Sequence, residues 1–389
     1  MTTVDRWQLP DGVEEVLPRQ ARVVEHLRRE LLDLYHQWGY QLVIPPLIEF
    51  TESLLIGLGR DLDLLTFKMT DQLSGRTLGI RADITPQVAR IDAHSLAEPG
   101  VTRLCYAGST LHTRPKSLLA SRSPIQLGAE LYGDDSLAGD VEIIRLMLAT
   151  LNAAGVAEVT LDLGHVGVYE AVLAAANVTP EQEADVFDAL QRKSRPDLLL
   201  ALTDIAAPAA ELILGLLELH GDAAVLETAR RLLTKAAPEA LTAVAALETV
   251  ATAIARSHPG TTVYFDLAEL RGYHYHTGMV FAAYAPGHGQ ALANGGRYND
   301  VGKVFGRARP ATGFATDLKA LMALVPISLS APGAVSAPDS DDPALLAAVT
   351  ALRKGGEVVI RCVGKSPDPR CDRMLVKADD EWVLRPLKP

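Results

Sequence analysis

Residues 269–278 read Glu-Leu-Arg-Gly-Tyr-His-Tyr-His-Thr-Gly, a dense polar segment between two stretches with the composition of β-strands. Thr262 to Leu267 before it and Met279 to Ala285 after it are rich in β-branched and aromatic residues, which predicts strands. A second glycine bend, Asn294-Gly295-Gly296-Arg297-Tyr298, follows. Strands that end in glycine bends with fixed polar side chains are typical of a small-molecule pocket, although an ordinary hairpin with exposed polar turns gives the same pattern.

The size and composition of the chain limit its class. Its 389 residues exceed the size of one hydrophobic core, so two or three domains are expected. The formal net charge of −11 argues against a general nucleic-acid surface, which requires clustered Lys and Arg. Three scattered cysteines favour free thiols over disulfides or a zinc site. The first residues have no apolar signal segment, so we expect a cytoplasmic protein without a membrane span.

The first half of the chain predicts alternating helices and strands. Apolar residues at three- and four-residue spacing from Gln20 to Trp38 predict an amphipathic helix that Gly39 ends. Residue composition, together with glycine and proline positions that end regular structure, predicts the further elements of this half. They are strand Tyr40–Ile44, a hairpin of Phe67–Asp71 and Thr77–Ile80, helix Gln87–Ala97, strands Arg103–Gly108 and Ile125–Gly133, helix Asp140–Ala154 and strand Ala157–Leu163.

Two places in this half bring polar side chains together. Asp83 and Thr85 precede the helix from Gln87, where they suit a ligand site or a simple N-cap. In the strand Ile125–Gly133, Gln126 and Glu130 share one face with Gly128 between them. A carboxylate and an amide beside a bare glycine suggest a floor for a polar ligand, whereas an exposed sheet face is the simpler interpretation.

The second half predicts an insertion and a small tail. Residues from about 166 to 258 have an Ala/Leu/Glu/Arg helical pattern, which indicates a helical insertion between two halves of one sheet domain. Gly313 to Thr316 leads into a helix with Phe314, Leu318 and Leu321 on one face. The expected organisation is a core at 1–325, a Ser/Ala/Pro/Asp-rich linker at 326–342 and a small C-terminal domain at 343–389, with a helix and two strands.

These motifs, taken in order, resemble histidyl-tRNA synthetase and its relatives over roughly residues 5–325. The opening helix, strand and Pro45 resemble motif 1 of the class II synthetases, residues 103–133 motif 2 and residues 313–321 motif 3. The run Arg271-Gly272-x-x-Tyr275-His276-Thr277-Gly278 resembles the histidine-specific signature. The resemblance implies an α/β (α+β) fold, with an antiparallel sheet flanked by helices.

Departures from the family pattern concern ATP. The family's motif 2 carries an arginine, and a glutamate two residues on, for the α-phosphate and adenine of ATP; here His112 and Arg114 stand there. Ala320 replaces the phosphate-binding arginine of motif 3. Because adenylation depends on positioned positive charge around the transferring phosphorus, we expect no synthetase activity. The tail is also shorter than the family's anticodon-binding domain, so we expect no tRNA partner.

The amino-acid pocket, in contrast, keeps most of the family pattern. The resemblance implies that Asp83, Thr85 and Gln126 hold the α-amino group of histidine, that Glu130 faces the imidazole and that Arg271 binds the carboxylate. Tyr275 and His276 complete this histidine-binding set. Two residues depart from the family pattern. Asp83 occupies a position where the family has a glutamate, whose side chain is one methylene longer, and His276 occupies a position where the family has a second tyrosine. The sequence implies no catalytic residue, metal or cofactor.

A chain with a histidine pocket, no ATP site and no anticodon domain resembles the regulatory subunits of ATP phosphoribosyltransferase. That resemblance implies a hetero-octamer with the short-form catalytic subunit, self-association through the motif 1-like region, and free histidine as the feedback effector in the first step of histidine biosynthesis. Two alternatives remain: a divergent amino-acid-activating enzyme, which would exchange pyrophosphate into ATP in the presence of histidine, and a scaffold whose pocket is a relic.

Overall fold

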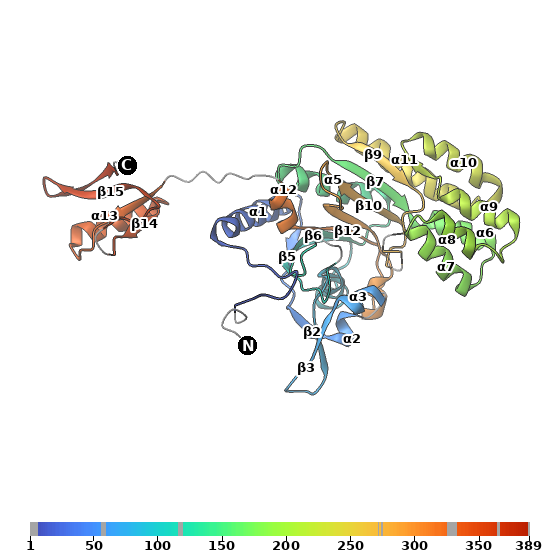
Figure 1. Cartoon of the computed structure of the whole chain (residues 1–389), viewed down its shortest axis with the longest axis horizontal. Helices are drawn as coiled ribbons and strands as arrows, with labels where there is room; N and C mark the ends of the chain where they lie inside the picture. Colours follow the sequence, from blue (N-terminus) through green and yellow to red (C-terminus); the bar gives the residue numbers. More distant parts are fainter. Residues whose placement is uncertain are drawn as a thin grey trace. The chain divides into compact units, whose positions relative to one another are not determined.

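The computed structural model describes residues 7–55, 60–115, 120–270, 272–273, 275–324, 333–363 and 366–387 (Figure 1). Contacts within the chain divide it into two compact units, Met1–Ile327 and Ser328–Pro389. The first unit contains a nine-stranded and a three-stranded sheet, and the second contains a four-stranded sheet.

The first unit begins with helix α1 (Pro18–Gln37). A proline occupies its first turn, where no intrahelical N–H bond is lost. Its four buried residues recur at three- and four-residue spacing and form one apolar stripe: Val24, Leu27, Leu31 and Tyr35. Gly39 follows the helix with φ +85°, a left-handed conformation that favours glycine. The predicted amphipathic helix is confirmed.

The nine-stranded sheet runs in the order β1-β5-β6-β12-β11-β10-β7-β9-β8. Most neighbouring pairs are antiparallel, as predicted, but β1 pairs with β5 and β7 with β9 in parallel. The strands are β1 (Gln41–Leu42), β5 (Thr102–Ser109), β6 (Ile125–Tyr132), β7 (Thr160–His165), β8 (His220–Gly221), β9 (Thr262–Asp266), β10 (Met279–Tyr284), β11 (Ala293–Arg297) and β12 (Ala311–Asp317). Six of the predicted strands therefore lie in this one sheet, as β1, β5, β6, β7, β9 and β10.

The two faces of this sheet have different surroundings. Leu127, Ala129 and Leu131 of β6 belong to the main hydrophobic core with α1 and α5 (Leu137–Ala153), and α12 (Leu318–Leu324) packs on the same layer. Glu130 and Tyr132 lie on the opposite face, because successive side chains of a strand alternate. There they meet α4 (Thr85–Arg90), the π-helix Ile91–Leu96 and the 3-10 helix Val301–Phe305.

A small antiparallel sheet stands beside this second face. It consists of β2 (Ile48–Phe50), β4 (Thr77–Ile80) and β3 (Phe67–Thr70), together with the short helices α2 (Thr51–Leu54) and α3 (Arg60–Leu65). The predicted hairpin is confirmed. Arg81 at its base is buried and donates hydrogen bonds to the backbone carbonyls of Pro45, at 2.8 Å, and Ser109, at 2.9 Å. These bonds fasten the small sheet to the ends of β1 and β5.

The predicted insertion is helical, at the right of Figure 1. Its helices are α6 (Val166–Ala176), α7 (Pro180–Gln191), α8 (Arg195–Ala201), α9 (Ala207–Leu216), α10 (Ala224–Ala236) and α11 (Ala240–Ser257). Among the described residues, α11 alone has the length and apolar composition of a membrane span. Its buried side chains belong to the main core and pack against α5 and α6, as expected for a core helix of a globular unit.

The second unit is a four-stranded sheet with one helix, in the order β14-β13-β15-β16. Its elements are β13 (Ala334–Ala337), α13 (Pro343–Lys354), β14 (Val359–Arg361), β15 (Cys371–Ala378) and β16 (Glu381–Pro386). The sequence predicts a linker where β13 lies, and that prediction is wrong: all four residues of β13 are buried. β13 is a central strand between β14 and β15 and consists mostly of small residues. Small residues have low strand propensity, so the composition of this segment does not predict a strand.

One predicted helix has the wrong start. Phe314 lies in β12, and the helix begins only at Leu318. The Gly-Phe-Ala-Thr run is therefore an inner strand, in which Gly313 pairs with Glu130 and Phe314 with Ala129 of β6. A short apolar run next to a helix is ambiguous by periodicity alone, and burial between two strands decides it here.

A buried ion pair holds the end of β11 to α5. The Arg297 guanidinium lies 3.1 Å from an Asp140 carboxylate oxygen, and both side chains are more than nine-tenths buried. Arg297 also donates to the backbone carbonyls of Asp134, at 2.8 Å, and Ser136, at 2.9 Å. Removal of the arginine would leave a buried carboxylate and two carbonyls without their donors.

We therefore expect Arg297→Ala to lower the free energy of unfolding by about 3–5 kcal/mol, measured by urea denaturation. Arg195→Ala is the matched control, because the exposed Arg195 pairs with the exposed Glu218 at 2.9 Å and contributes at most about 1 kcal/mol. Equal effects of the two substitutions would contradict this account of the buried pair.

Candidate functional site

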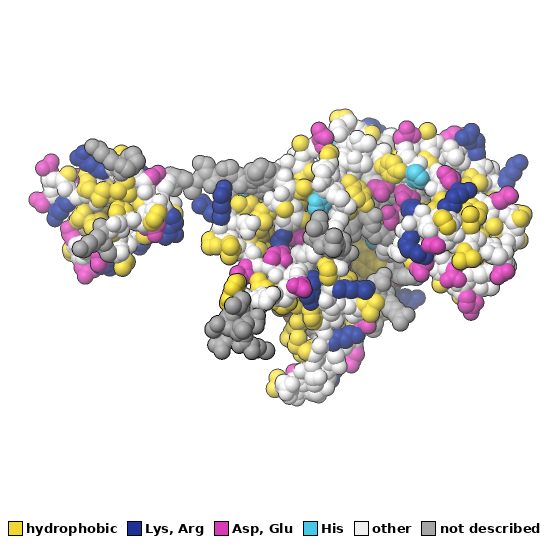
Figure 2. Space-filling view, viewed as in Figure 1, with side chains coloured by type: hydrophobic (Ala, Val, Ile, Leu, Met, Phe, Trp, Pro, Cys, Tyr) yellow, Lys and Arg dark blue, Asp and Glu magenta, His cyan; other side chains and the backbone are white. Residues whose placement is uncertain are grey.

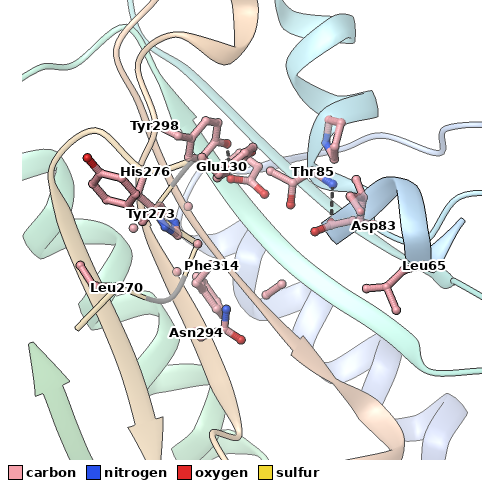
Figure 3. Close-up of a pocket in the computed structure, with 18 of the residues that line it drawn as sticks. Leu65, Asp83, Thr85, Glu130, Leu270, Tyr273, His276, Asn294, Tyr298 and Phe314 are labelled. Carbon is pink, nitrogen blue, oxygen red and sulfur yellow. Dashed lines mark hydrogen bonds between the residues drawn. The ribbon is translucent and has the colours of Figure 1, made fainter. Parts of the chain in front are cut away.

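A cavity of about 330 Å³ opens where β6, β11, β12, α4, α7 and the signature segment meet (Figure 3). Asp83 and Leu65 lie on one side of it, and Leu270, Tyr273 and His276 on the other. Its volume is at the lower end of the range for small-molecule pockets, which suits a ligand the size of one amino acid. The other polar and aromatic residues that line it are Thr85, Glu130, Phe187, Gln191, Tyr275, Asn294, Tyr298 and Phe314.

Glu130 forms the floor of this cavity and is 1% exposed. Its carboxylate accepts a hydrogen bond of 3.0 Å from the Tyr106 hydroxyl and another, short one from the Tyr298 hydroxyl. Gly313 of β12 lies directly opposite, and any side chain there would collide with the carboxylate. A glycine at this register position is therefore required for the carboxylate to reach the cavity.

Burial raises the pKa of Glu130 to about 8, although the hydroxyls of Tyr298, Thr85 and Tyr106 work in the opposite direction by hydrogen bonding. The negative charge of Asp83 adds to the increase. The carboxyl group therefore holds its proton over much of the neutral range. A ligand that brings a cation or a strong hydrogen-bond donor to the floor would favour the ionised form.

Asp83, Thr85 and Gln126 form one hydrogen-bonded group beside the floor. The Asp83 carboxylate accepts from the Gln126 side-chain amide at 2.8 Å and from the Thr85 backbone N–H at 2.9 Å. The Gln126 oxygen accepts from the Ile84 N–H at 2.9 Å. Thr85 contacts the Tyr106 hydroxyl at 3.0 Å and so connects this group to Glu130.

The signature segment forms the opposite wall. The centroid of the Tyr275 ring lies 4.9 Å from that of Tyr298, and Tyr275 is partly buried. The His276 ring fills space next to Gly272 and Gly296, where added side chains would collide with it. Gly272 has φ +66°, a conformation that favours glycine. Gly272 of the signature and Gly296 of β11 therefore make room for His276.

Five of the seven predicted histidine-binding residues line this one cavity: Asp83, Thr85, Glu130, Tyr275 and His276. Gln126 lines a neighbouring cavity instead, and both ends of its amide are bonded to Asp83 and Ile84. Its position is that of a support for Asp83. Arg271 lies outside the described residues.

One detail of the predicted floor is wrong. Gly128 does not leave a bare surface for a ligand, because the Tyr106 ring lies across it and an added side chain would collide with the hydroxyl. Sequence reasoning missed Tyr106 as a partner of Glu130. Tyr298 was part of the quoted Gly-Gly-Arg-Tyr run, but its bond to Glu130 depends on strand pairing that the sequence does not reveal.

The neighbouring cavity, of about 730 Å³, lies beside the predicted motif 2 and motif 3 segments. Three carboxylates line it, from Glu14, Asp83 and Asp317, together with Lys319. Lys319 is paired with Glu14 at 2.8 Å. A polyphosphate requires cations, and the one lysine among the described residues of this lining is already paired with a carboxylate.

At the predicted motif 2 phosphate position His112 faces a backbone carbonyl, and the nearby Arg122 also binds backbone carbonyls. His112 is buried, with its Nε2 atom 2.9 Å from the Ala82 carbonyl oxygen. Arg122 donates to the backbone carbonyls of Asp11, at 2.8 Å, and His112, at 3.1 Å. Ala320 lines the cavity with a methyl group. Among the described residues, no group of three or more His, Cys, Asp or Glu side chains could hold a metal ion.

Comparisons with known proteins agree with this geometry. The histidyl-tRNA synthetase family model matches residues 12–321, and the model of the C-terminal domain of ATP phosphoribosyltransferase subunit HisZ matches residues 332–385. ATP phosphoribosyltransferase regulatory subunits from Thioalkalivibrio sulfidiphilus and Stutzerimonas stutzeri are 55% and 51% identical to this chain, over the full length of each protein. The chain belongs to the family of ATP phosphoribosyltransferase regulatory subunits.

Solved structures of related proteins have the same fold as this chain. An ATP phosphoribosyltransferase regulatory subunit/histidyl-tRNA synthetase from Bacillus halodurans is 28% identical, with a TM-score of 0.79 over 92% of each chain. A histidyl-tRNA synthetase from Nostoc sp. PCC 7120 has a TM-score of 0.77 at 19% identity, which shows the fold alone. The predicted class II synthetase-like fold and the predicted regulatory role are both confirmed for this family member.

The raised pKa of Glu130 predicts a specific pH dependence of stability. Above about pH 4.5 the unfolded chain loses this proton, whereas the folded chain keeps it up to about pH 8, so a rise in pH through this window disfavours the folded state. Relative to Glu130→Gln, the wild-type chain should lose unfolding free energy on the order of 4 kcal/mol between pH 5 and pH 8, measured by urea denaturation.

Above that window the difference between the two chains should stay constant. Glu181→Gln, on the exposed face of α7, should follow the wild-type curve. Parallel curves for wild type and Glu130→Gln across the whole range would show that Glu130 ionises normally in the folded chain.

Proposed function

We propose that this chain activates the short-form catalytic subunit of ATP phosphoribosyltransferase and conveys feedback inhibition by free histidine. The observation that carries the proposal is the contrast between two adjacent cavities. One has the size and polar floor that a single amino acid needs, and the other carries three carboxylates where a nucleotide would need cations. Together they favour a site that binds an amino acid without activating it.

We propose a pose for histidine in the first cavity in which each polar group of the ligand has a partner. We place its imidazole against Glu130 and its α-amino group against Asp83 and Thr85. Tyr275 and His276 enclose the ring from the signature side. Arg271 is proposed to bind the carboxylate, on the strength of the family signature. An imidazole N–H directed at a buried carboxylate would form a charge-assisted hydrogen bond, which favours histidine over apolar amino acids.

Feedback then follows from a difference in affinity. If histidine binds more tightly to one arrangement of the complex, it shifts the complex toward that arrangement by the ratio of the two affinities. Coupling energies of this kind are typically about 1–3 kcal/mol, which corresponds to a 5- to 150-fold change in affinity. The chain needs no catalytic residue or cofactor of its own for this role.

The proposed assembly is a cytoplasmic hetero-octamer with self-association through the motif 1-like region. Support comes from exposed hydrophobic side chains on and near β1, the edge strand of the large sheet: Trp38, Leu42, Ile44, Leu47 and Ile48. Exposed apolar side chains that accumulate along one segment favour an interaction site. The proposal includes no tRNA, since Lys and Arg are interspersed with Asp and Glu on the face shown in Figure 2.

The test is the rate of phosphoribosyl-ATP formation by the short catalytic subunit of the same organism, with and without this chain, across a histidine titration. We expect the chain to raise the rate and histidine to reverse the increase. Activation without a histidine response would support a scaffold with a relic pocket, and no activation would refute the proposal.

Two variants locate the effect in the cavity. Arg271→Ala and Glu130→Gln should still activate the partner but should require about 10- to 100-fold more histidine for half-inhibition, because each loses a charged contact with the effector. Arg256→Ala, on the exposed side of α11, is the control and should be inhibited like the wild type. Unchanged inhibition of Arg271→Ala and Glu130→Gln would place the effector site elsewhere.

A further inference from the structure

Helix α7 of the insertion forms part of the cavity wall. Phe187 and Gln191, one helical turn apart, both line the cavity. The other side of α7 is buried in the insertion through Val186, Ala189 and Leu190, which belong to the main hydrophobic core. The helix therefore has one face toward the cavity and another toward the interior of the insertion.

The signature segment is attached to the same helices through Tyr273. Its ring lies 5.0 Å from that of Tyr169 in α6, at 88°, and 5.4 Å from that of Phe187 in α7, at 41°. Tyr169 and Phe187 contact each other at 6.3 Å, so the three rings form a closed cluster. The Tyr273 hydroxyl also donates to a Glu183 carboxylate oxygen at 3.4 Å.

We infer that the insertion completes the effector site: Phe187 contacts the effector and determines its specificity, and Tyr273 is a positioning residue that couples occupancy of the cavity to α6 and α7. The inference rests on the proposed function, since it takes an amino acid with a planar ring as the ligand. It assigns a role to the insertion, which lies across the cavity from Asp83 and Thr85.

The chemistry of the wall supports this assignment. Glu130, Asp83 and Thr85 offer polar contacts at the floor, whereas Phe187, Tyr273 and Leu270 offer an apolar surface. A planar ring hydrogen-bonded to the floor would present its face or edge to Phe187, a favourable aromatic arrangement. A ligand that contacts both the sheet and α7 bridges them, and it therefore stabilises their closed arrangement relative to an open one.

The first test is calorimetric titration of the full chain with L-histidine. Phe187→Ala should weaken binding about tenfold, because it removes the aromatic face, and Phe187→Tyr should restore most of the affinity. Tyr169→Phe is the matched control. The Tyr169 hydroxyl is buried without a hydrogen-bond partner in the described part of the chain, so its removal should leave histidine binding unchanged.

The second test is hydrogen–deuterium exchange of residues 166–191 in the full chain, with and without L-histidine. In the wild type, histidine should slow exchange in α6 and α7. In Tyr273→Leu this slowing should be lost even at histidine concentrations that saturate the site, whereas Tyr273→Phe, which keeps the ring cluster, should behave like the wild type. A purely structural role for Tyr273 would alter exchange equally in the free and bound chains.

The outcomes separate this inference from the proposed function. If the wild-type chain binds no histidine, both are refuted. If it binds histidine but Phe187→Ala binds equally well and exchange in residues 166–191 does not respond, the effector site stands and the role of the insertion is refuted.

Discussion

The buried carboxyl group of Glu130 is the constraint on which the site depends. It can lie on the sheet face only because Gly313 across the strand pair has no side chain, and it is held there by the hydroxyls of Tyr106 and Tyr298. Burial raises its pKa to about 8, so the group is costly to ionise until a ligand supplies a compensating donor. A carboxyl group whose ionisation is unfavourable in the empty cavity and favourable when a ligand is bound is suited to sensing that ligand.

The class II framework explains why a regulatory subunit needs so little rearrangement. The sheet, α4 and the signature segment form the first cavity, the proposed histidine site, and its lining shares only a few residues with the neighbouring cavity. In that neighbouring cavity, Lys319 is paired with Glu14, and His112 Nε2 faces the Ala82 carbonyl oxygen. Phosphoryl chemistry requires positioned positive charge, so these contacts are consistent with the proposal that this cavity does not activate a nucleotide.

The sequence predicted six strands of the large sheet and five residues that line the first cavity, because alternation along β6 and the glycine-rich signature are local patterns. The sequence did not predict the features that depend on packing between segments far apart in the chain. The Tyr106 ring fills the space above Gly128, Phe187 reaches the cavity from an insertion over 50 residues away, and β13 is recognised as a strand only by its burial between neighbours. Gln126 was correctly assigned to the sheet face, but its amide turned out to be committed to Asp83 and Ile84.

The central claim is that this chain binds histidine in the first cavity and does not bind ATP in the second. The most direct measurement is calorimetric titration of the isolated chain with L-histidine, followed by titration of the histidine-saturated chain with Mg-ATP. We expect one histidine per chain and no binding of ATP. Stoichiometric ATP binding that histidine strengthens would contradict it and would point instead to an amino-acid-activating enzyme.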